Sequence, residues 1–263
     1  MNIAKITTLF FSPTGTSKKI VQAIAKGAGQ SCQIEHIDLT LPKHSKPKVF
    51  AGNELTIIAV PVYAGRVAQL AKERLQQFSG SNSPAIIVVT YGNREFEDAL
   101  IELKDLAEAQ SFSVVAASAF IGEHSFSSAK TPIAQGRPDD NDLKIAKEFG
   151  QKTMQQLLAS ATPADLKVPG DTPYKEGMKN LPFTPTVDTD ECTQCEECIS
   201  VCPSGAISLT DQIQINAELC IFCCACIKNC PVECISLKNT PMQEKAGALH
   251  LNCQQRKEPQ LFY

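Results

Sequence analysis

The C-terminal part of the chain is organised around a cysteine motif that occurs twice, as Cys192-Thr-Gln-Cys195-Glu-Glu-Cys198-Ile-Ser-Val-Cys202-Pro203 and as Cys220-Ile-Phe-Cys223-Cys-Ala-Cys226-Ile-Lys-Asn-Cys230-Pro231. Thiolates use this spacing to hold iron–sulfur clusters. The repeat extends beyond the cysteines, because the residues from Pro203 to Leu209 align with those from Pro231 to Leu237. Two similar half-units therefore predict one small module.

Zinc is the alternative metal, since Cys-x-x-Cys pairs also suit tetrahedral zinc sites. A structural zinc site is closed by four ligands, whereas each copy of the motif has a third cysteine at the same interval and then Cys-Pro. The pattern therefore favours iron and sulfide. The stretch from Thr186 to Thr240 is too short to bury a conventional core, so we expect the clusters themselves to supply one.

Composition narrows the class of protein. The chain has 263 residues, a formal net charge of −3 and 43% hydrophobic residues, which allow one large or two ordinary domains and give no basic footprint for nucleic acid. The opening apolar run from Ile6 to Phe11 is short and is followed by Pro13, so we expect no signal peptide, no membrane span and a cytoplasmic protein. Clustered cysteines in that compartment favour metal over disulfides.

Strands and helices alternate in residues 1–161. The expected strands are Ile3–Phe11, Ile34–Leu39, Leu55–Val60, Ala85–Thr90 and Phe112–Ile121, and the expected helices are Thr16–Ala28, Val67–Phe78, Phe96–Ala109 and Asp139–Leu158. We expect Pro61 to stop the third strand. This alternation predicts a parallel sheet covered on both faces, with its ligand at the carboxyl ends of the strands.

The first strand-to-helix loop favours a phosphate. Ser12, Thr14, Thr16 and Ser17 supply hydroxyl groups, Gly15 permits close approach of the backbone, and the following helix directs free N–H groups at the same place. The loop is neither a dinucleotide fingerprint nor a nucleoside-triphosphate loop. A simple helix N-cap is the alternative interpretation.

The pattern Ser-x-Thr-Gly-x-Ser resembles the FMN phosphate loop of flavodoxins, which implies a doubly wound sheet of five parallel strands in the order 2-1-3-4-5. Two later loops agree with that resemblance, since flavodoxins close such loops over the isoalloxazine ring. The residues that they add to the implied FMN site are Pro61, Val62, Tyr63, Ala64, Gly65, Tyr91, Gly92 and Asn93. Tyr63 and Tyr91 are the expected ring-covering residues, and Gly122–Phe126, after the fifth strand, is expected to border the same pocket.

The cysteine stretch resembles a bacterial two-cluster [4Fe–4S] ferredoxin, a small α+β domain in which the fourth thiolate of each motif binds the other cluster. The resemblance implies one cluster on Cys192, Cys195, Cys198 and Cys230, and a second on Cys220, Cys223, Cys226 and Cys202. Together the two parts resemble the fused flavodoxin–ferredoxin proteins of anaerobic bacteria and archaea. The expected domains are a flavodoxin-like domain (1–161), a Pro-rich linker (162–185), a ferredoxin domain (186–240) and a tail (241–263).

Two cysteines depart from the ferredoxin pattern. Cys224 stands where ferredoxins usually have glycine, and Cys234 stands where the first repeat has Ala206. We expect both, with Cys253 and Cys32, to be buried or free thiols. The tail has no assigned role, although Leu261–Tyr263 are apolar enough to dock onto a domain.

The predicted function is transfer of single electrons between redox partner proteins, through two [4Fe–4S] clusters and FMN. One alternative is an FMN-dependent reductase of a small substrate that its own ferredoxin domain supplies with electrons. Another is a docking module that has lost flavin, but the Ser/Thr/Gly loop is present. The sequence does not identify the donor, the acceptor or the oligomeric state.

Overall fold

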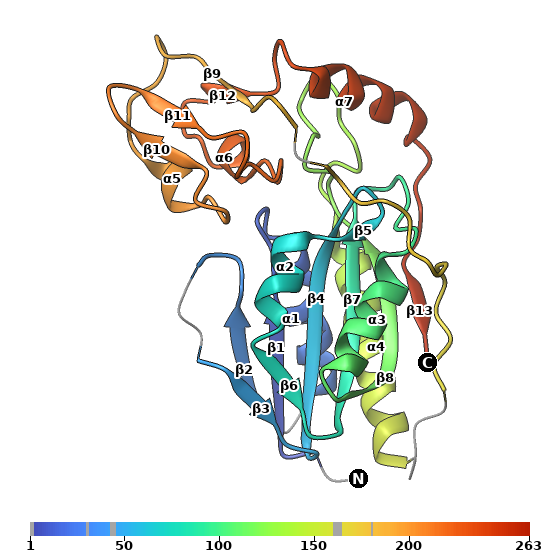
Figure 1. Cartoon of the computed structure of the whole chain (residues 1–263). Helices are drawn as coiled ribbons and strands as arrows, with labels where there is room; N and C mark the ends of the chain where they lie inside the picture. Colours follow the sequence, from blue (N-terminus) through green and yellow to red (C-terminus); the bar gives the residue numbers. More distant parts are fainter. Residues whose placement is uncertain (1–2, 30–31, 43–45, 160–164, 180) are drawn as a thin grey trace.

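The largest element of the computed structural model, which describes residues 3–29, 32–42, 46–159, 165–179 and 181–263, is a sheet with the strand order β13-β8-β7-β4-β1-β2. Its parallel strands are β1 (Lys5–Phe10), β2 (Gln33–Asp38), β4 (Glu54–Tyr63), β7 (Ser83–Tyr91) and β8 (Phe112–Ile121). Taken in chain order, these five have the predicted arrangement 2-1-3-4-5, which is the flavodoxin-like doubly wound order (Figure 1).

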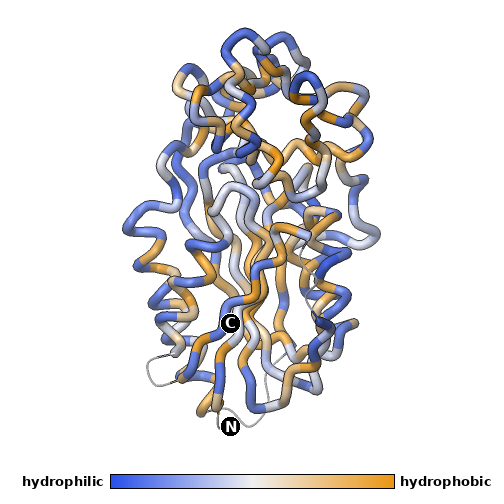
Figure 2. Tube along the Cα trace, turned by 90° about the vertical axis from the view of Figure 1, so that its left-hand side faces the viewer, coloured by the Kyte–Doolittle hydropathy of each residue, from blue (hydrophilic) through white to orange (hydrophobic). Residues whose placement is uncertain are grey.

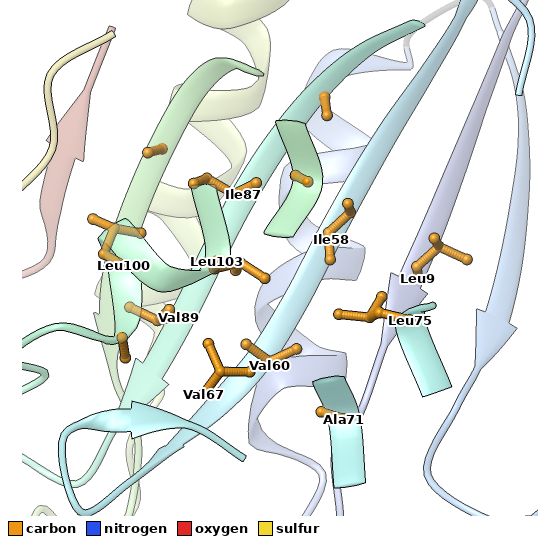
Figure 3. Packing of buried hydrophobic residues seen from close by; sticks show 14 of the residues in the cluster. Leu9, Ile58, Val60, Val67, Ala71, Leu75, Ile87, Val89, Leu100 and Leu103 are labelled. Atoms are coloured by element: carbon orange, nitrogen blue, oxygen red, sulfur yellow. The ribbon is translucent and has the colours of Figure 1, made fainter. Parts of the chain in front are cut away.

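Helices cover both faces of this sheet because successive residues of each strand point to opposite sides. On one face, Ile58 and Val60 of β4 and Ile87 and Val89 of β7 pack against α2 (Gln69–Leu75) and α3 (Ala99–Ala109), as Figure 3 shows. On the other face, the intervening residues pack against α1 (Thr16–Ala28) and α4 (Asp140–Ala159). Hydrophobic residues follow the central strands, and hydrophilic ones mark the outer helices and loops (Figure 2).

Three sequence-based boundaries were wrong. β4 continues through Pro61 to Tyr63 and folds back as β5 (Arg66–Val67), because Ala64 (φ 52°) and Gly65 (φ 81°) form a tight hairpin turn. The expected helix Val67–Phe78 is shorter because Val67 pairs in β5 and Phe78 opens β6 (Phe78–Gly80), which pairs with β3 (Lys48–Phe50). The expected helix Phe96–Ala109 begins only at Ala99.

The cysteine-rich part is small and built from short elements. They are β9 (Thr186–Val187), α5 (Glu197–Ser200), β10 (Ile207–Leu209), β11 (Ile213–Ile215), α6 (Ala225–Lys228) and β12 (Ile235–Ser236). Two antiparallel pairs, β10–β11 and β12–β9, enclose a core made of isoleucines and cysteines. This part lies above the carboxyl ends of the parallel strands (Figure 1). None of the helices in the described ranges has the length and hydropathy needed to span a bilayer.

The connecting segments attach the cysteine-rich part to the sheet at both of its ends. On the incoming side, residues 165–179 form no helix or strand and run along α3, where the Asp98 carboxylate accepts N–H bonds from Asp171 (2.9 Å) and Lys175 (2.8 Å). On the outgoing side, α7 (Pro241–Asn252) leads to β13 (Gln260–Phe262), which pairs antiparallel with β8. The expected boundary between residues 161 and 162 lies outside the described residues.

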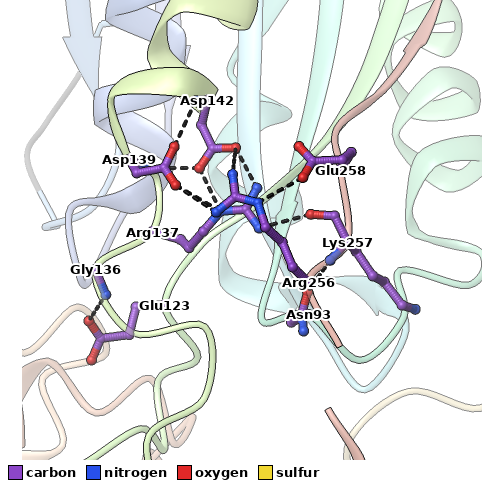
Figure 4. Close-up of polar contacts among 9 residues, drawn as sticks. All are labelled: Asn93, Glu123, Gly136, Arg137, Asp139, Asp142, Arg256, Lys257 and Glu258. Atoms are coloured by element: carbon purple, nitrogen blue, oxygen red, sulfur yellow. Dashed lines mark hydrogen bonds and ion pairs between the residues drawn. The ribbon is translucent and has the colours of Figure 1, made fainter. Parts of the chain in front are cut away.

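The tail is fixed by a buried ion pair as well as by strand pairing. Arg137 is 7% exposed and forms two hydrogen bonds with Asp142, which is fully buried, and its other nitrogen donates to the Lys257 carbonyl at 2.8 Å. Arg256 adds a more exposed ion pair with Asp139 at 2.7 Å (Figure 4). Asp139 and Asp142 also accept each other's backbone N–H groups, which caps α4.

We expect Arg137→Met to lower the free energy of unfolding by about 3 kcal/mol, because the buried Asp142 carboxylate loses both of its hydrogen bonds to Arg137 and keeps only the more exposed Arg256, at 3.8 Å, as a countercharge. Arg256→Met is the matched control, and we expect a much smaller loss, since that side chain is 45% exposed. Urea denaturation of the two variants measures both values. Equal losses would contradict the role given to the buried pair.

Candidate functional site

The Ser12–Ser17 loop lines a cavity at the carboxyl edge of the sheet. Gly15 adopts φ 81°, which a residue with a Cβ rarely does, and precedes the first turn of α1. Ser12 accepts the Lys18 N–H at 3.0 Å, and the buried Ser17 hydroxyl bonds Thr90 at 2.7 Å. The remaining lining comes from β4, from β7 and from the loop after β8, and it includes Pro61, Val62, Tyr63, Tyr91, Gly92, Gly122, Glu123, His124 and Ser125. The expectation that residues 122–126 border this pocket is confirmed for Gly122 to Ser125, whereas Phe126 lines the adjoining cavity described next.

A second cavity of about 360 Å³ adjoins the first and lies between the sheet and the C-terminal part. The two cavities share Val62, Tyr63, His124 and Ser125. The wall on the opposite side comes from elements that are distant in sequence, namely Ile221, Phe222, Lys245, Leu249 and Met178. Sequence reasoning missed these residues because only the tertiary structure brings them to the loops. The volume lies in the range of small-molecule and cofactor pockets.

The residues of the predicted FMN site occupy different positions around these cavities. Ala64 lines the second cavity, whereas Gly65 lies in the hairpin turn. Tyr63 is half-buried and lines both cavities, but the Tyr91 ring is 4% exposed and packs on Phe96 at 5.4 Å between ring centroids. Burial raises the pKa of Tyr91 to about 12.

The Asn93 amide has a structural partner. Its nitrogen donates to the Cys253 and Gln255 carbonyls at 2.8 Å each, and its oxygen accepts the Lys257 N–H at 3.3 Å. This side chain therefore holds the tail, and only the Asn93 backbone remains for a ligand.

His124 brings a neutral ring to both cavities. Its Nδ1 accepts the Phe126 N–H at 3.0 Å, which places the proton on Nε2. Burial, together with the positive charges of Arg94, Lys245 and Lys228, lowers its pKa from 6.5 to about 4. The cavity therefore has a hydrogen-bond donor surrounded by positive charge, an environment suited to an anionic ligand.

The first predicted set of cysteines surrounds one cavity. Cys192, Cys195, Cys198 and Cys230 all line it, so the fourth thiol comes from the second copy of the motif. Cys234 lines the same cavity, and its sulfur lies 3.5 Å from that of Cys230. The expectation that Cys234 is a buried thiol is confirmed.

The second set lies deeper in the structure. Cys202 interacts electrostatically with Cys220, Cys223 and Cys226, so again one thiol comes from the other copy. Burial raises the pKa of Cys226 to about 12 and that of Cys223 further. Thiolates in such an environment need positive charge, which the irons of a cluster supply. Within the described ranges, no three or more His, Cys, Asp or Glu side chains are gathered closely enough to hold a single metal ion.

Comparison with known proteins identifies the C-terminal part most directly. Residues 185–208 match the family described as 4Fe-4S binding domain. No curated protein sequence matches the chain.

The N-terminal part is similar in structure to several flavoproteins. A flavodoxin from the domain Archaea is 15% identical, with a TM-score of 0.44 over 59% of this chain and 99% of its own. A flavodoxin of Fusobacterium nucleatum bound to flavin mononucleotide is 11% identical, with a TM-score of 0.38 over 60% of this chain and 98% of its own. The rubredoxin oxygen:oxidoreductase of Desulfovibrio gigas is 12% identical, with a TM-score of 0.44 over 60% of this chain and 37% of its own.

These similarities are distant, and it is the strand order that defines the N-terminal fold. The chain therefore combines a flavodoxin-like domain with a 4Fe–4S binding domain.

We expect Gly122→Ala to weaken FMN binding by roughly tenfold or more, which corresponds to about 1.4 kcal/mol. A Cβ at Gly122 would lie 2.0 Å from Cγ2 of Thr16 and would displace the Thr16 side chain, whose hydroxyl is one of the predicted phosphate ligands. Gly247→Ala is the matched control, because no atom lies within 4 Å of the added carbon. Titration of the apoprotein with FMN measures the affinity of both variants. Equal affinities would show that the close contact between Gly122 and Thr16 is not needed for FMN binding.

We expect His124 to make stability pH-dependent. Because the unfolded chain binds this proton at a higher pH than the folded chain, the stabilisation is present above about pH 6.5 and is lost as the pH falls toward 4. His124→Gln should reduce the difference between urea midpoints measured at pH 7 and pH 5. An NMR titration that finds the ring protonating near its ordinary pKa would contradict this prediction.

Proposed function

We propose that the protein passes single electrons between redox partner proteins through two [4Fe–4S] clusters and FMN. FMN exchanges one or two electrons whereas each cluster exchanges one, so the pairing joins one-electron partners to a two-electron carrier. The proposed domains are those expected from sequence, namely 1–161 for FMN, 162–185 as linker, 186–240 for the clusters and 241–263 as the tail.

One observation carries this proposal. The second cavity is lined on one side by Val62, Tyr63 and Ala64 of the predicted flavin loop, and on the other by Ile221 and Phe222, which lie between two predicted cluster ligands. A ring bound there would contact both parts of the protein. That closeness is what transfer between two redox groups requires.

The proposed roles follow from position. Ser12, Thr14, Gly15, Thr16 and Ser17 would bind the FMN phosphate through hydroxyls and the first-turn N–H groups of α1. Val62, Tyr63 and Ala64 would contact the ring, and His124 would donate a hydrogen bond from Nε2. Gly92 and the Asn93 backbone, in the loop after β7, would form the second predicted contact with the FMN. The thiols described above would hold the two clusters in their two sets.

The charge of the C-terminal part supports protein partners. No lysine or arginine occurs between residues 181 and 227, whereas this stretch contains seven acidic residues, Asp188, Asp190, Glu191, Glu196, Glu197, Asp211 and Glu218. Two clusters would add further negative charge. Basic partners should therefore associate quickly and in a salt-dependent way.

A reductase of a small substrate is the second candidate function. A third cavity, of about 680 Å³, lies beside Tyr63 and is also lined by Arg66, Arg74 and Cys220. It offers space for a substrate next to the proposed ring. Turnover of pre-reduced protein by a small molecule would favour the enzyme, and reoxidation only by protein acceptors would favour the carrier.

We expect anaerobically reconstituted protein to contain about eight irons, eight sulfides and one FMN per chain. Chemical analysis together with the visible spectrum measures all three. Protein with iron and sulfide that neither binds FMN nor reduces it through the clusters would disprove the proposal. A content of about four irons and one FMN would show that the protein holds a single cluster, and the rest of the proposal would stand.

We expect Cys220→Ala to lose about half of the bound iron, because it removes a thiolate of one cluster and leaves the ligands of the other intact. Cys32→Ala is the control, since Cys32 lies beside β2, far along the chain from both motifs. Iron and sulfide analysis of the two variants provides the readout. Full iron content in Cys220→Ala would show that this thiol is not a ligand.

A further inference from the structure

The two cysteine motifs have the same backbone conformation. Gln194 and Glu196 in the first copy have φ angles of 54° and 60°, and the aligned Phe222 and Cys224 have 51° and 60°. In both copies a four-residue helix follows, α5 in the first and α6 in the second. Any difference between the two loops therefore comes from their side chains and their surroundings.

The surroundings of the two loops are opposite. Gln194, Cys195 and Glu196 are all exposed to solvent. The aligned residues of the second copy are buried, with Phe222 at 3%, Cys223 at 7% and Cys224 at 2% exposure. The side chains match these environments, because the first loop is polar and the second is apolar. Cys224, which stands where glycine is expected from sequence, behaves as a small apolar residue and so suits this buried position.

What covers the second loop is the flavodoxin-like domain. Ile221 and Phe222 line the same cavity as Tyr63 and His124. Cys220 and Ile221 also line the third cavity together with Tyr63, Arg66 and Arg74 of the flavodoxin-like domain.

Residues next to the second set of ligands also bond to the sheet domain. Lys228 donates to Glu123 at 2.8 Å and to the Ser127 carbonyl at 2.7 Å. Arg74 donates to the carbonyl of Pro203, which follows Cys202, at 2.6 Å. By contrast, Gln194 of the first loop bonds the Asp211 carbonyl within its own module.

We propose that the two clusters have different places in the route of the electron. The cluster on Cys202, Cys220, Cys223 and Cys226 exchanges electrons directly with FMN, across Ile221 and Phe222. The cluster on Cys192, Cys195, Cys198 and Cys230 is the outer one and exchanges electrons with partner proteins at the exposed Cys195 loop. This inference rests on the proposed function.

The electron balance is simple in either direction. When a partner is the donor, one electron would enter the outer cluster, pass to the inner cluster and then to the flavin, and each cluster would return to its oxidised state. Two such passages, with protons taken from solvent, reduce FMN fully. No bond to carbon forms or breaks, and the redox partner protein is the only co-reactant.

Electron paramagnetic resonance of the reconstituted protein tests the order. Cys195→Ser and Cys223→Ser each replace one thiolate of one set by an oxygen ligand, which changes the signal of that cluster alone. With flavin and clusters partly reduced, the measured quantity is the microwave-power saturation of the flavin's paramagnetic signal, which depends on the nearest cluster. We expect a change in Cys223→Ser and none in Cys195→Ser.

A pair of variants that keeps every ligand provides the second measurement. Phe222→Gln and Gln194→Phe exchange the aligned residues of the two loops. We expect Phe222→Gln to shift the visible spectrum and midpoint potential of bound FMN, and Gln194→Phe to leave both unchanged. This pair keeps the test decisive if Cys223→Ser does not fold.

The two levels of inference fail differently. Protein without FMN would disprove the proposed function, whereas protein with FMN and only about four irons would remove the second cluster and with it the proposed order of the clusters. Protein with FMN and about eight irons, in which the flavin responds to Cys195→Ser or to Gln194→Phe, would overturn only the order of the clusters.

Discussion

Attachment of the cysteine-rich part at both ends is the constraint on which the rest of the structure depends. Asp98 holds the incoming segment through two backbone N–H groups, and β13 returns the chain to the sheet as an antiparallel partner of β8. The buried Arg137–Asp142 pair fixes that return through the Lys257 carbonyl. A module tethered at one end would sample many positions, whereas two tethers hold it over the carboxyl edge of the sheet.

Because the cysteine-rich part lies over this edge, the second cavity is lined by residues of both parts of the protein. A doubly wound sheet leaves its ligand exposed at the ends of the strands, and here Ile221 and Phe222 cover that edge. The cover is apolar where it meets Tyr63, and Lys245, Arg94 and Lys228 place positive charge around the neutral His124. Glu123 and Glu176 also line the two cavities, but each is paired with a lysine, Lys228 and Lys179 respectively, so the surroundings of His124 remain suited to an anionic ligand.

The internal repeat shows how one motif serves two environments. Both copies keep the cysteine spacing and the positive φ angles, since these make the ligand loop. Only the residues between the cysteines differ, from Thr193 and Gln194 in solvent to Ile221 and Phe222 at the interface. Burial thus explains the apolar second loop and is compatible with Cys224. The structure offers a place for Cys234 beside the first set, but no comparable reason for its presence.

The sequence by itself determined the class of both parts, because its signals are local. Apolar periodicity predicted all five parallel strands, and cysteine spacing predicted the cluster module. Sequence-based prediction was wrong where contacts between distant residues determine the end of an element. At Pro61, for example, pairing with β5 prolongs β4. Only the tertiary structure assigned Asn93 to the tail, brought His124 and Phe222 to one cavity and distinguished the two cysteine sets by burial. These features depend on contacts between distant residues, and periodicity and spacing carry no information about such contacts.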